Sequence, residues 1–291
     1  MATIEVFGQP TVAIPADAEV GEGPFWDHRT GRFCWVDITR GVLFENDLVT
    51  GDQTATKVDT MLGAAAPRAT EDGFAVAVSE GFGFIKNGQL EIVDAVLPES
   101  YRRMNDAKCD SSGRLWAGST HMQFEPGAGA LHVWTGDGPS RLAASGFTLP
   151  NGIGWSPDDT MMYLVDSMAR QLLSAPFNAA DGTVGEFTQL AAIEEPGLPD
   201  GLTVDMDGNI WVAIWAGSEV RKYNPAGELV GRVPLPVDQP SSCAFAADGT
   251  LLITSATAGI SEADLEHQPL AGSVFTLATT THGVPVRPFE G

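Results

Sequence analysis

The amino-acid sequence predicts a closed all-β fold, a six-bladed β-propeller, built as a single domain over residues 1–291. One phrase of sequence recurs six times at a period of roughly 40–50 residues, which is typical of propeller blades. Short apolar runs rich in β-branched and aromatic residues follow each copy, as strands require. The 33 Gly and 19 Pro are spread along the whole chain, which indicates many tight turns and no disordered block.

The recurring phrase is clearest where the chain reads "LPNGIGWSPDDTMMYLVD" from Leu149 and "LPDGLTVDMDGNIWVAI" from Leu198. Both copies open with Leu-Pro, a small polar residue and Gly, and both continue through an Asp-containing turn into a hydrophobic strand. The polar residue after Pro is position two of the repeat. Across the six copies position two is occupied by Glu22, Ala65, Asn105, Asn151, Asp200 and Ser241.

Each copy leads into one predicted strand that is bounded by Gly or Asp. These strands cover residues 32–38, 73–78, 114–119, 161–167, 209–217 and 250–256. A closed ring needs its ends joined, so we expect "TIEVFG" (residues 3–8) and "SVFTLATT" (residues 273–280) to lie in one blade. Two short helices are expected, over residues 260–270 and 97–104. Repeats of paired helices would need long segments with a 3.6-residue period, and the sequence has none.

The charge of the chain argues against two classes of partner. There are 16 Lys and Arg against 38 Asp and Glu, a formal charge of -22. Such a field repels phosphate backbones and anionic lipid surfaces, so neither nucleic acid nor a membrane is expected as a partner. The field is compatible with a cation site and with a neutral small-molecule substrate.

The three cysteines are Cys34, Cys109 and Cys243, which lie far apart and in or beside apolar strands. We expect buried free thiols, which are typical of a reducing compartment. The N-terminal "MATIEVFGQP" has no basic segment followed by an apolar run, so no signal peptide is expected. Together these features predict a cytoplasmic protein.

Position two of the repeat predicts a ring of polar side chains. In a propeller the same repeat position recurs at the same radius and height, so position two should lie at the mouth of the central channel. Carboxylate or amide side chains occupy four of these positions, namely Glu22, Asn105, Asn151 and Asp200. Oxygen ligands without His or Cys are typical of a hard divalent cation such as Ca²⁺, Mg²⁺ or Mn²⁺. The alternative is that these residues only form turns, although Glu22 is a poor turn former.

Five segments resemble the senescence marker protein/regucalcin/gluconolactonase family. They read "GEGPFWDHRTGRFCWVDI", "RMNDAKCDSSGRLWAGS", "LPNGIGWSPDDTMMYLVDS", "LPDGLTVDMDGNIWVAIWAG" and "LEHQPLAGSVF". The resemblance covers nearly the whole chain. It implies a six-bladed propeller with one divalent metal ion in its channel, Ca²⁺ by preference and Mg²⁺, Mn²⁺ or Zn²⁺ otherwise. Many members of the family hydrolyse sugar lactones.

By this resemblance, Glu22, Asn151 and Asp200 correspond to the three protein ligands of the metal ion. A metal-bound lactone carbonyl is polarised, and an attacking water must lose a proton. Asp200 is placed to accept that proton, and Asp106 is the rival base.

The resemblance also implies substrate contacts. Arg103, Asn105 and Asp106, in "RMND", correspond to the segment that contacts the substrate. A further contact falls near His121 and Gln123, where "THMQFE" departs from the family's usual sequence, and this departure leaves the identity of the lactone open.

The sequence therefore predicts a metal-dependent lactonase that acts on a sugar or similar small lactone. Two other functions use the same fold and metal site: a non-catalytic Ca²⁺-binding propeller that docks a protein partner, and a metal-dependent organophosphate esterase. The crowding of Arg103, Asn105 and Asp106 at the mouth of the same channel favours catalysis. The oligomeric state stays open.

Overall fold

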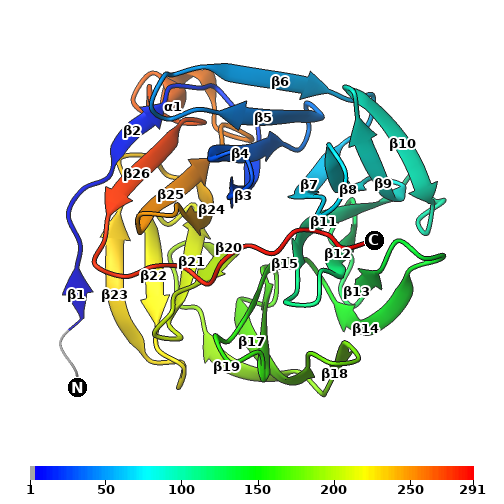
Figure 1. Cartoon of the computed structure of the whole chain (residues 1–291). Coiled ribbons are helices and arrows are strands. Elements are labelled where there is room, and N and C mark those ends of the chain that lie inside the picture. Colours follow the sequence, from blue (N-terminus) through cyan, green and yellow to red (C-terminus); the bar gives the residue numbers. More distant parts are fainter. Residues whose placement is uncertain (1–3) are drawn as a thin grey trace.

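The computed structural model describes residues 4–291, which form six β-sheets arranged as blades around a central channel (Figure 1). Within the blades, most strands pair antiparallel with their neighbours along the chain. The predicted six-bladed, all-β propeller is thereby confirmed. Within the described part of the chain, no helix is long and apolar enough to cross a membrane.

Each blade begins with its innermost strand. The first blade contains β3 (Gly21–Asp27), β4 (Arg32–Asp37), β5 (Val42–Asn46) and β6 (Gln53–Lys57). The second contains β7 (Leu62–Pro67), β8 (Phe74–Val78), β9 (Gly81–Lys86) and β10 (Gln89–Asp94). The third contains β11 (Arg102–Cys109), β12 (Leu115–His121), β13 (Gly129–Trp134) and β14 (Arg141–Phe147). The fourth blade contains β15 (Pro150–Trp155), β16 (Met161–Asp166), β17 (Gln171–Asn178), β18 (Thr183–Val184) and β19 (Thr188–Ala192). The fifth contains β20 (Leu198–Val204), β21 (Ile210–Trp215), β22 (Glu219–Tyr223) and β23 (Leu229–Pro234). The sixth contains β24 (Pro240–Phe245), β25 (Thr250–Ser255), β26 (Val274–Ala278) and β2 (Thr11–Ile14).

The ring closes in the last blade, where β2 pairs with β26. The expectation that residues 3–8 provide this strand is wrong, and Thr3 lies outside the described residues. Residues of that segment form β1 (Glu5–Val6), which pairs in parallel with β23 of the neighbouring blade. The physical reason is burial: β1 is exposed, whereas Ile14 at the end of β2 packs into the core of the last blade. Phe7 secures the N-terminal segment by packing 5.1 Å from the Trp211 ring.

One of the two predicted helices is present. α1 (Glu262–Leu265) lies within residues 260–270, and the Ser261 side chain caps its first turn. Residues 97–104 are not helical, because the chain enters β11 there and buries Met104 completely. Burial in a sheet outweighs the local helix propensity of this segment.

Apolar clusters between neighbouring blades form the core. Trp211 of β21, for example, packs against Phe245 of the next blade with ring centroids 5.7 Å apart. The predicted free thiols are confirmed, since Cys34, Cys109 and Cys243 are unpaired and buried. Burial raises the pKa of each thiol, that of Cys243 to about 12.

The inner strands share an irregularity near their starts. The pairing register shifts after Glu22 in β3, after Met104 in β11, after Pro150 in β15, after Pro199 in β20 and after Pro240 in β24. Such a bulge leaves residues unpaired and re-aims their side chains, and bulges are common beside active sites. Position two of the repeat therefore coincides with a bulge at one end of the channel.

The second blade corrects one repeat assignment. Its register shift lies between Leu62 and Ala64, so Gly63, and not Ala65, occupies the equivalent place. A Cβ atom at Gly63 would collide with the backbone carbonyl oxygen of Asn105 on the adjacent inner strand. This close approach of two strands explains why the second blade contributes no polar side chain at that height.

The C-terminal residues 283–289 cover the other end of the channel. This strap crosses the ring in Figure 1 as the red chain. The amide of Val284 donates to the carbonyl of Val204, and that of Phe289 donates to the carbonyl of Pro67 (2.9 and 2.7 Å). Both acceptors lie at the ends of inner strands, opposite the bulges, so the strap leaves the bulged end of the channel uncovered.

Candidate active site

The starts of the inner strands surround a cavity of about 300 Å³. Five of the predicted site residues line it: Glu22 from β3, Arg103 and Asn105 from β11, Asn151 from β15 and Asp200 from β20. Residues almost 180 positions apart in the chain thus meet, because each lies at the bulge of its own inner strand.

The predicted metal ligands are buried and close together. Glu22 is 4% exposed, and Asn151 and Asp200 are each 6% exposed. The Asn151 amide donates to Oδ1 of Asp200 and, at 3.2 Å, to the hydroxyl of Ser167. Oε2 of Glu22 accepts a hydrogen bond of 2.7 Å from the amide of Gly23, whereas Oε1 is buried without a partner among residues 4–291.

The electrostatics of the cavity are unfavourable for carboxylates alone. Burial, reinforced by the charges of Asp200 and Asp106, raises the pKa of Glu22 well above its usual value. Burial and the charge of Asp106 likewise raise the pKa of Asp200, although Arg103 and the Asn151 amide oppose the change. The raised pKa values show that the protein does not compensate the negative charge of these two neighbouring buried carboxylates. A bound cation would therefore stabilise both of them.

The donor set fits a hard divalent cation. Glu22, Asn151 and Asp200 present carboxylate and amide oxygens, which are the ligands that Ca²⁺ and Mg²⁺ prefer. The unpartnered Oε1 of Glu22 is the strongest observation, because a buried carboxylate oxygen without a partner is costly. A cation shared by these three side chains would satisfy that oxygen and neutralise the two negative charges.

Arg103 and Asn105 form the polar wall beside these residues. Nη1 of Arg103 donates to the Asn105 side-chain oxygen at 2.6 Å and to the Met104 carbonyl at 3.0 Å. The Asn105 amide donates to the carbonyl of Pro150 at 3.1 Å, which ties β11 to β15. Burial lowers the pKa of Arg103 to about 10, so its guanidinium group stays charged at neutral pH and faces the carboxylates.

Asp106 is buried but does not line the same cavity. It faces a separate void of about 20 Å³ with Lys108, and its Oδ1 accepts a hydrogen bond of 2.8 Å from the amide of Ala107. Burial raises the pKa of Asp106, and the charge of Lys108 opposes that change. Alternation along β11 explains the separation, since Arg103 and Asn105 point to one side of the strand and Asp106 points to the other.

His121 and Gln123 also lie outside the cavity. Nδ1 of His121 accepts a hydrogen bond of 3.1 Å from the Gln123 amide, and the His121 ring lies 5.3 Å from the ring of Tyr101. The residue of this loop that does line the cavity is Phe124.

Several lining residues escaped the sequence analysis. They are mostly apolar and include Ile38, Phe124, Leu149, Met168, Leu198 and Trp215, with Ser167 as a polar member. Ser167 is the last residue of the predicted strand 161–167, and Trp215 lies two residues before the end of the predicted strand 209–217. A place near the end of the second strand of a blade is therefore the signal that could have found both residues.

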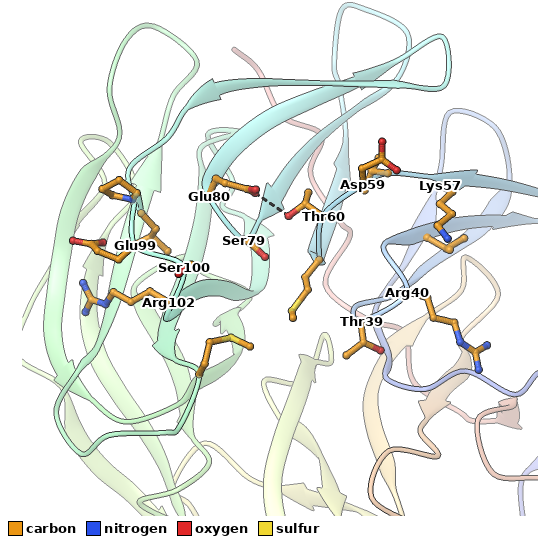
Figure 2. A pocket seen from close by; sticks show the side chains of 16 residues that line it. Thr39, Arg40, Lys57, Asp59, Thr60, Ser79, Glu80, Glu99, Ser100 and Arg102 are labelled. Carbon is orange, nitrogen blue, oxygen red and sulfur yellow. Dashed lines mark hydrogen bonds between the residues drawn. The ribbon is translucent and has the colours of Figure 1, made fainter.

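A larger groove of about 860 Å³ lies between the first three blades (Figure 2). Its basic and acidic side chains are equal in number, namely Arg40, Lys57 and Arg102 against Asp59, Glu80 and Glu99. Glu80 accepts a hydrogen bond of 2.9 Å from Thr60, drawn in Figure 2, and Arg40 pairs with Asp17 at 3.1 Å. The groove is open and its charges balance, whereas the smaller cavity gathers buried polar groups around an unpartnered oxygen. The smaller cavity is therefore the candidate active site.

The chain is similar to known proteins over most of its length. Residues 20–257 match the model of the SMP-30/gluconolactonase/LRE-like region. The chain is 33% identical to L-arabinolactonase of Azospirillum brasilense, over 100% of this chain and 99% of that protein. It is 30% identical to pentonolactonase XacC of Haloferax volcanii, over 94% of this chain and 96% of that one.

A solved structure shares the whole fold. The crystal structure of regucalcin from Agrobacterium tumefaciens strain C58, described as a calcium-binding protein, superimposes with a TM-score of 0.92 and 27% identity and covers 100% of both chains. With the matched region spanning most of the propeller, the chain belongs to the SMP-30/gluconolactonase/LRE-like family.

Proposed function

We propose that the protein is a divalent-metal-dependent lactonase, which opens the ester ring of a sugar or similar small lactone. The observation that carries the proposal is the buried set of oxygen donors, with an unpartnered carboxylate oxygen on Glu22, beside a charged arginine in one cavity. The lactonases among the relatives support the same reaction class.

Glu22, Asn151 and Asp200 would hold the metal ion. Their formal charge of -2 matches a divalent cation, so the site buries no surplus charge once it is filled. Ca²⁺ is the first candidate because it accepts carboxylate and amide oxygens in flexible geometry, and Mg²⁺, Mn²⁺ and Zn²⁺ are the alternatives. When bound, the ion supplies Lewis-acid polarisation of the lactone carbonyl.

The side chains of the protein transfer the proton and orient the substrate. Water adds to the acyl carbon, the ring C–O bond breaks, and the product is a hydroxy acid. Asp200 accepts a proton from the attacking water and returns it to the ring oxygen as the C–O bond breaks. Arg103 donates hydrogen bonds to substrate oxygens and orients the ring. Asp106, the rival base, faces away from the cavity and is the weaker candidate.

A non-catalytic calcium-binding propeller is the second candidate, because the regucalcin structure is described as calcium-binding. Both candidates need the cation, so metal binding alone does not separate them. Of these two, only the lactonase hydrolyses a lactone. A metal-dependent organophosphate esterase, the remaining alternative, would hydrolyse phosphate triesters.

The test is hydrolysis measured with a pH indicator. Three kinds of substrate would be tested: sugar lactones, aliphatic lactones and a phosphate triester. Each would be assayed before and after treatment of the protein with a chelator, and again after metal is added back. The proposal expects lactone hydrolysis that disappears with the chelator and returns with Ca²⁺ or another divalent ion. Hydrolysis that persists unchanged in the chelator would refute the metal dependence, and metal binding without any turnover would favour the scaffold.

A further inference from the structure

The mouth of the cavity carries three large apolar side chains, Phe124, Met168 and Trp215, which we call the apolar mouth. Phe124 comes from the loop between β12 and β13, Met168 from the turn between β16 and β17, and Trp215 ends β21. Phe124 is 37% exposed, Met168 is 43% exposed and Trp215 is half-buried. Three blades thus bring apolar surface to one opening and leave it in water, and such gatherings mark binding sites.

The backbone at the apolar mouth is strained, and the loop of Phe124 is tied down. Phe124 has φ = +54°, and Ala216, directly after the tryptophan of the apolar mouth, has φ = +56°. Residues with a side chain seldom adopt positive φ, and they keep it where the surrounding structure imposes it. The Phe124 amide donates to the His121 carbonyl at 2.9 Å, and Arg102 donates to the Ala128 carbonyl. These contacts hold the backbone of Phe124 in place at the opening.

Part of the hydrogen-bonding capacity of the cavity is already used by the protein. Nη1 of Arg103 is shared between the Met104 carbonyl and Asn105, and the Asn105 amide is bound to the Pro150 carbonyl. Apart from the proposed metal ligands, the rest of the Arg103 guanidinium group and the Ser167 hydroxyl remain for substrate. A polyhydroxylated lactone would lose water from several hydroxyl groups and would find few new partners, which is unfavourable.

We propose that the cavity selects lactones with an apolar substituent on the ring, an alkyl chain of several carbons, and that the apolar mouth binds this chain. The inference rests on the proposed lactone hydrolysis and names its substrate class. The ring lies among the polar groups of Arg103 and the metal ligands, and the chain lies against Phe124, Met168 and Trp215. The reaction is unchanged: water adds, the acyl C–O bond breaks, and an alkyl-substituted hydroxy acid leaves.

The first experiment compares kcat/KM for γ-butyrolactone, γ-hexalactone and γ-octalactone with that for L-arabinono-γ-lactone, which has the same ring and several hydroxyl groups. The inference expects kcat/KM to rise about fourfold for each methylene that is buried, and to be higher for the octalactone than for the sugar lactone. Equal values along the alkyl series, or a preference for the hydroxylated ring, would overturn it.

The second experiment removes the phenyl ring without endangering the fold. Phe124→Gly suits the positive φ at this position, so the variant should fold at least as well as the wild type. The ratio of kcat/KM for octalactone to that for butyrolactone should fall about tenfold, as expected for one or two methylenes losing their contact. The matched control is Met206→Gln, an exposed methionine that lines a different cavity, and it should leave the ratio unchanged. An unchanged ratio in Phe124→Gly would contradict the inference.

Binding separates this inference from the proposed function. If no lactone is hydrolysed, the lactonase proposal fails, and calorimetry with alkyl-substituted γ-lactams, which resist hydrolysis, still tests the apolar mouth. Affinity that rises with chain length and drops in Phe124→Gly supports the inference. Affinity that is independent of chain length overturns it.

Discussion

Replacing Asp200 by Asn should stabilise the metal-free protein and reduce the stability that a bound metal ion adds. In the metal-free protein the Asp200 carboxylate is buried near Glu22 and Asp106, and both carboxylates repel it, whereas Arg103 attracts it. Asparagine keeps the shape and removes the charge. The metal-free variant should therefore be more stable than the metal-free wild type, and the difference should grow as pH rises, because burial and the charge of Asp106 disfavour ionisation of Asp200 in the folded protein.

The size of the effect follows from simple electrostatics. Two unit charges about 5 Å apart interact by about 3 kcal/mol at an effective dielectric constant of about 20. The attraction of Arg103 offsets one of the two repulsions, and the desolvation of the carboxylate adds to what remains. Removing the charge should stabilise the metal-free fold by about 1–3 kcal/mol, or roughly 2–6 °C in Tm for a chain of this size.

Metal should stabilise the wild type more than the variant. Loss of one anionic ligand should weaken the binding of the ion by about 100-fold or more, because outer partners of metal ligands alone are worth about 10–100-fold. At a metal concentration of 100 times its Kd, the wild type gains about 2.7 kcal/mol, whereas the variant gains about 0.4 kcal/mol. At saturating metal, kcat of the variant should still be about 10²–10⁴ lower, since an amide cannot take a proton from water.

Thermal unfolding, equilibrium dialysis and steady-state kinetics on the same two proteins check these values. Unaltered metal affinity in Asp200→Asn would show that Asp200 is not a metal ligand. If the variant has the wild-type kcat at saturating metal, Asp200 is not the general base, and Asp106 becomes the candidate for that role. A metal-free variant less stable than the wild type would contradict the charge argument.

Three further results are expected. Arg103→Ala should lower kcat/KM strongly and lower the Tm of the metal-loaded protein by no more than about 2 °C, because the cation would neutralise the carboxylates that Arg103 faces and the remaining loss is a hydrogen bond of about 1 kcal/mol to Asn105; a large loss of Tm with intact turnover would assign a structural role. Burial, with the charge of Arg102, lowers the pKa of His132 to about 4, so acid should destabilise the fold by about 3 kcal/mol as pH falls from about 6.5, the unfolded value, to 4. His132→Gln should flatten that loss in pH-dependent denaturant unfolding, and an unchanged slope would exclude His132 as its source. The three buried thiols should resist a thiol reagent in the native state and react as three per chain after denaturation without reductant; a single reactive thiol would reveal a disulfide.

The sequence was sufficient to predict the ring and much of the site because both depend on the repeat. Each repeat of the sequence forms one blade, and the blades are arranged around the channel. Residues at equal repeat positions therefore lie close together at the same end of the channel. Glu22, Asn151 and Asp200 were found in this way, and their bulges explain why they leave the sheets to line the cavity. Ala65 failed as a member because the register shift of its blade lies two residues earlier.

Other features depend on interactions that the repeat does not encode. Asp106 follows Asn105 in sequence, yet strand alternation sends it to a different void. The closing strand was misplaced because the choice between β1 and β2 depends on which segment buries apolar residues against β26. Phe124 lies in a non-repeating loop, and its positive φ is imposed by tertiary contacts that no local pattern announces.

The central claim is that Glu22, Asn151 and Asp200 converge on one divalent cation. Crystals of the protein soaked in Mn²⁺ and measured at the manganese absorption edge would locate the ion by its anomalous signal. The account predicts one strong peak in the cavity, at about 2.0–2.6 Å from oxygens of all three side chains, including Oε1 of Glu22. A cavity without a peak, or a peak bound by other residues, would contradict it.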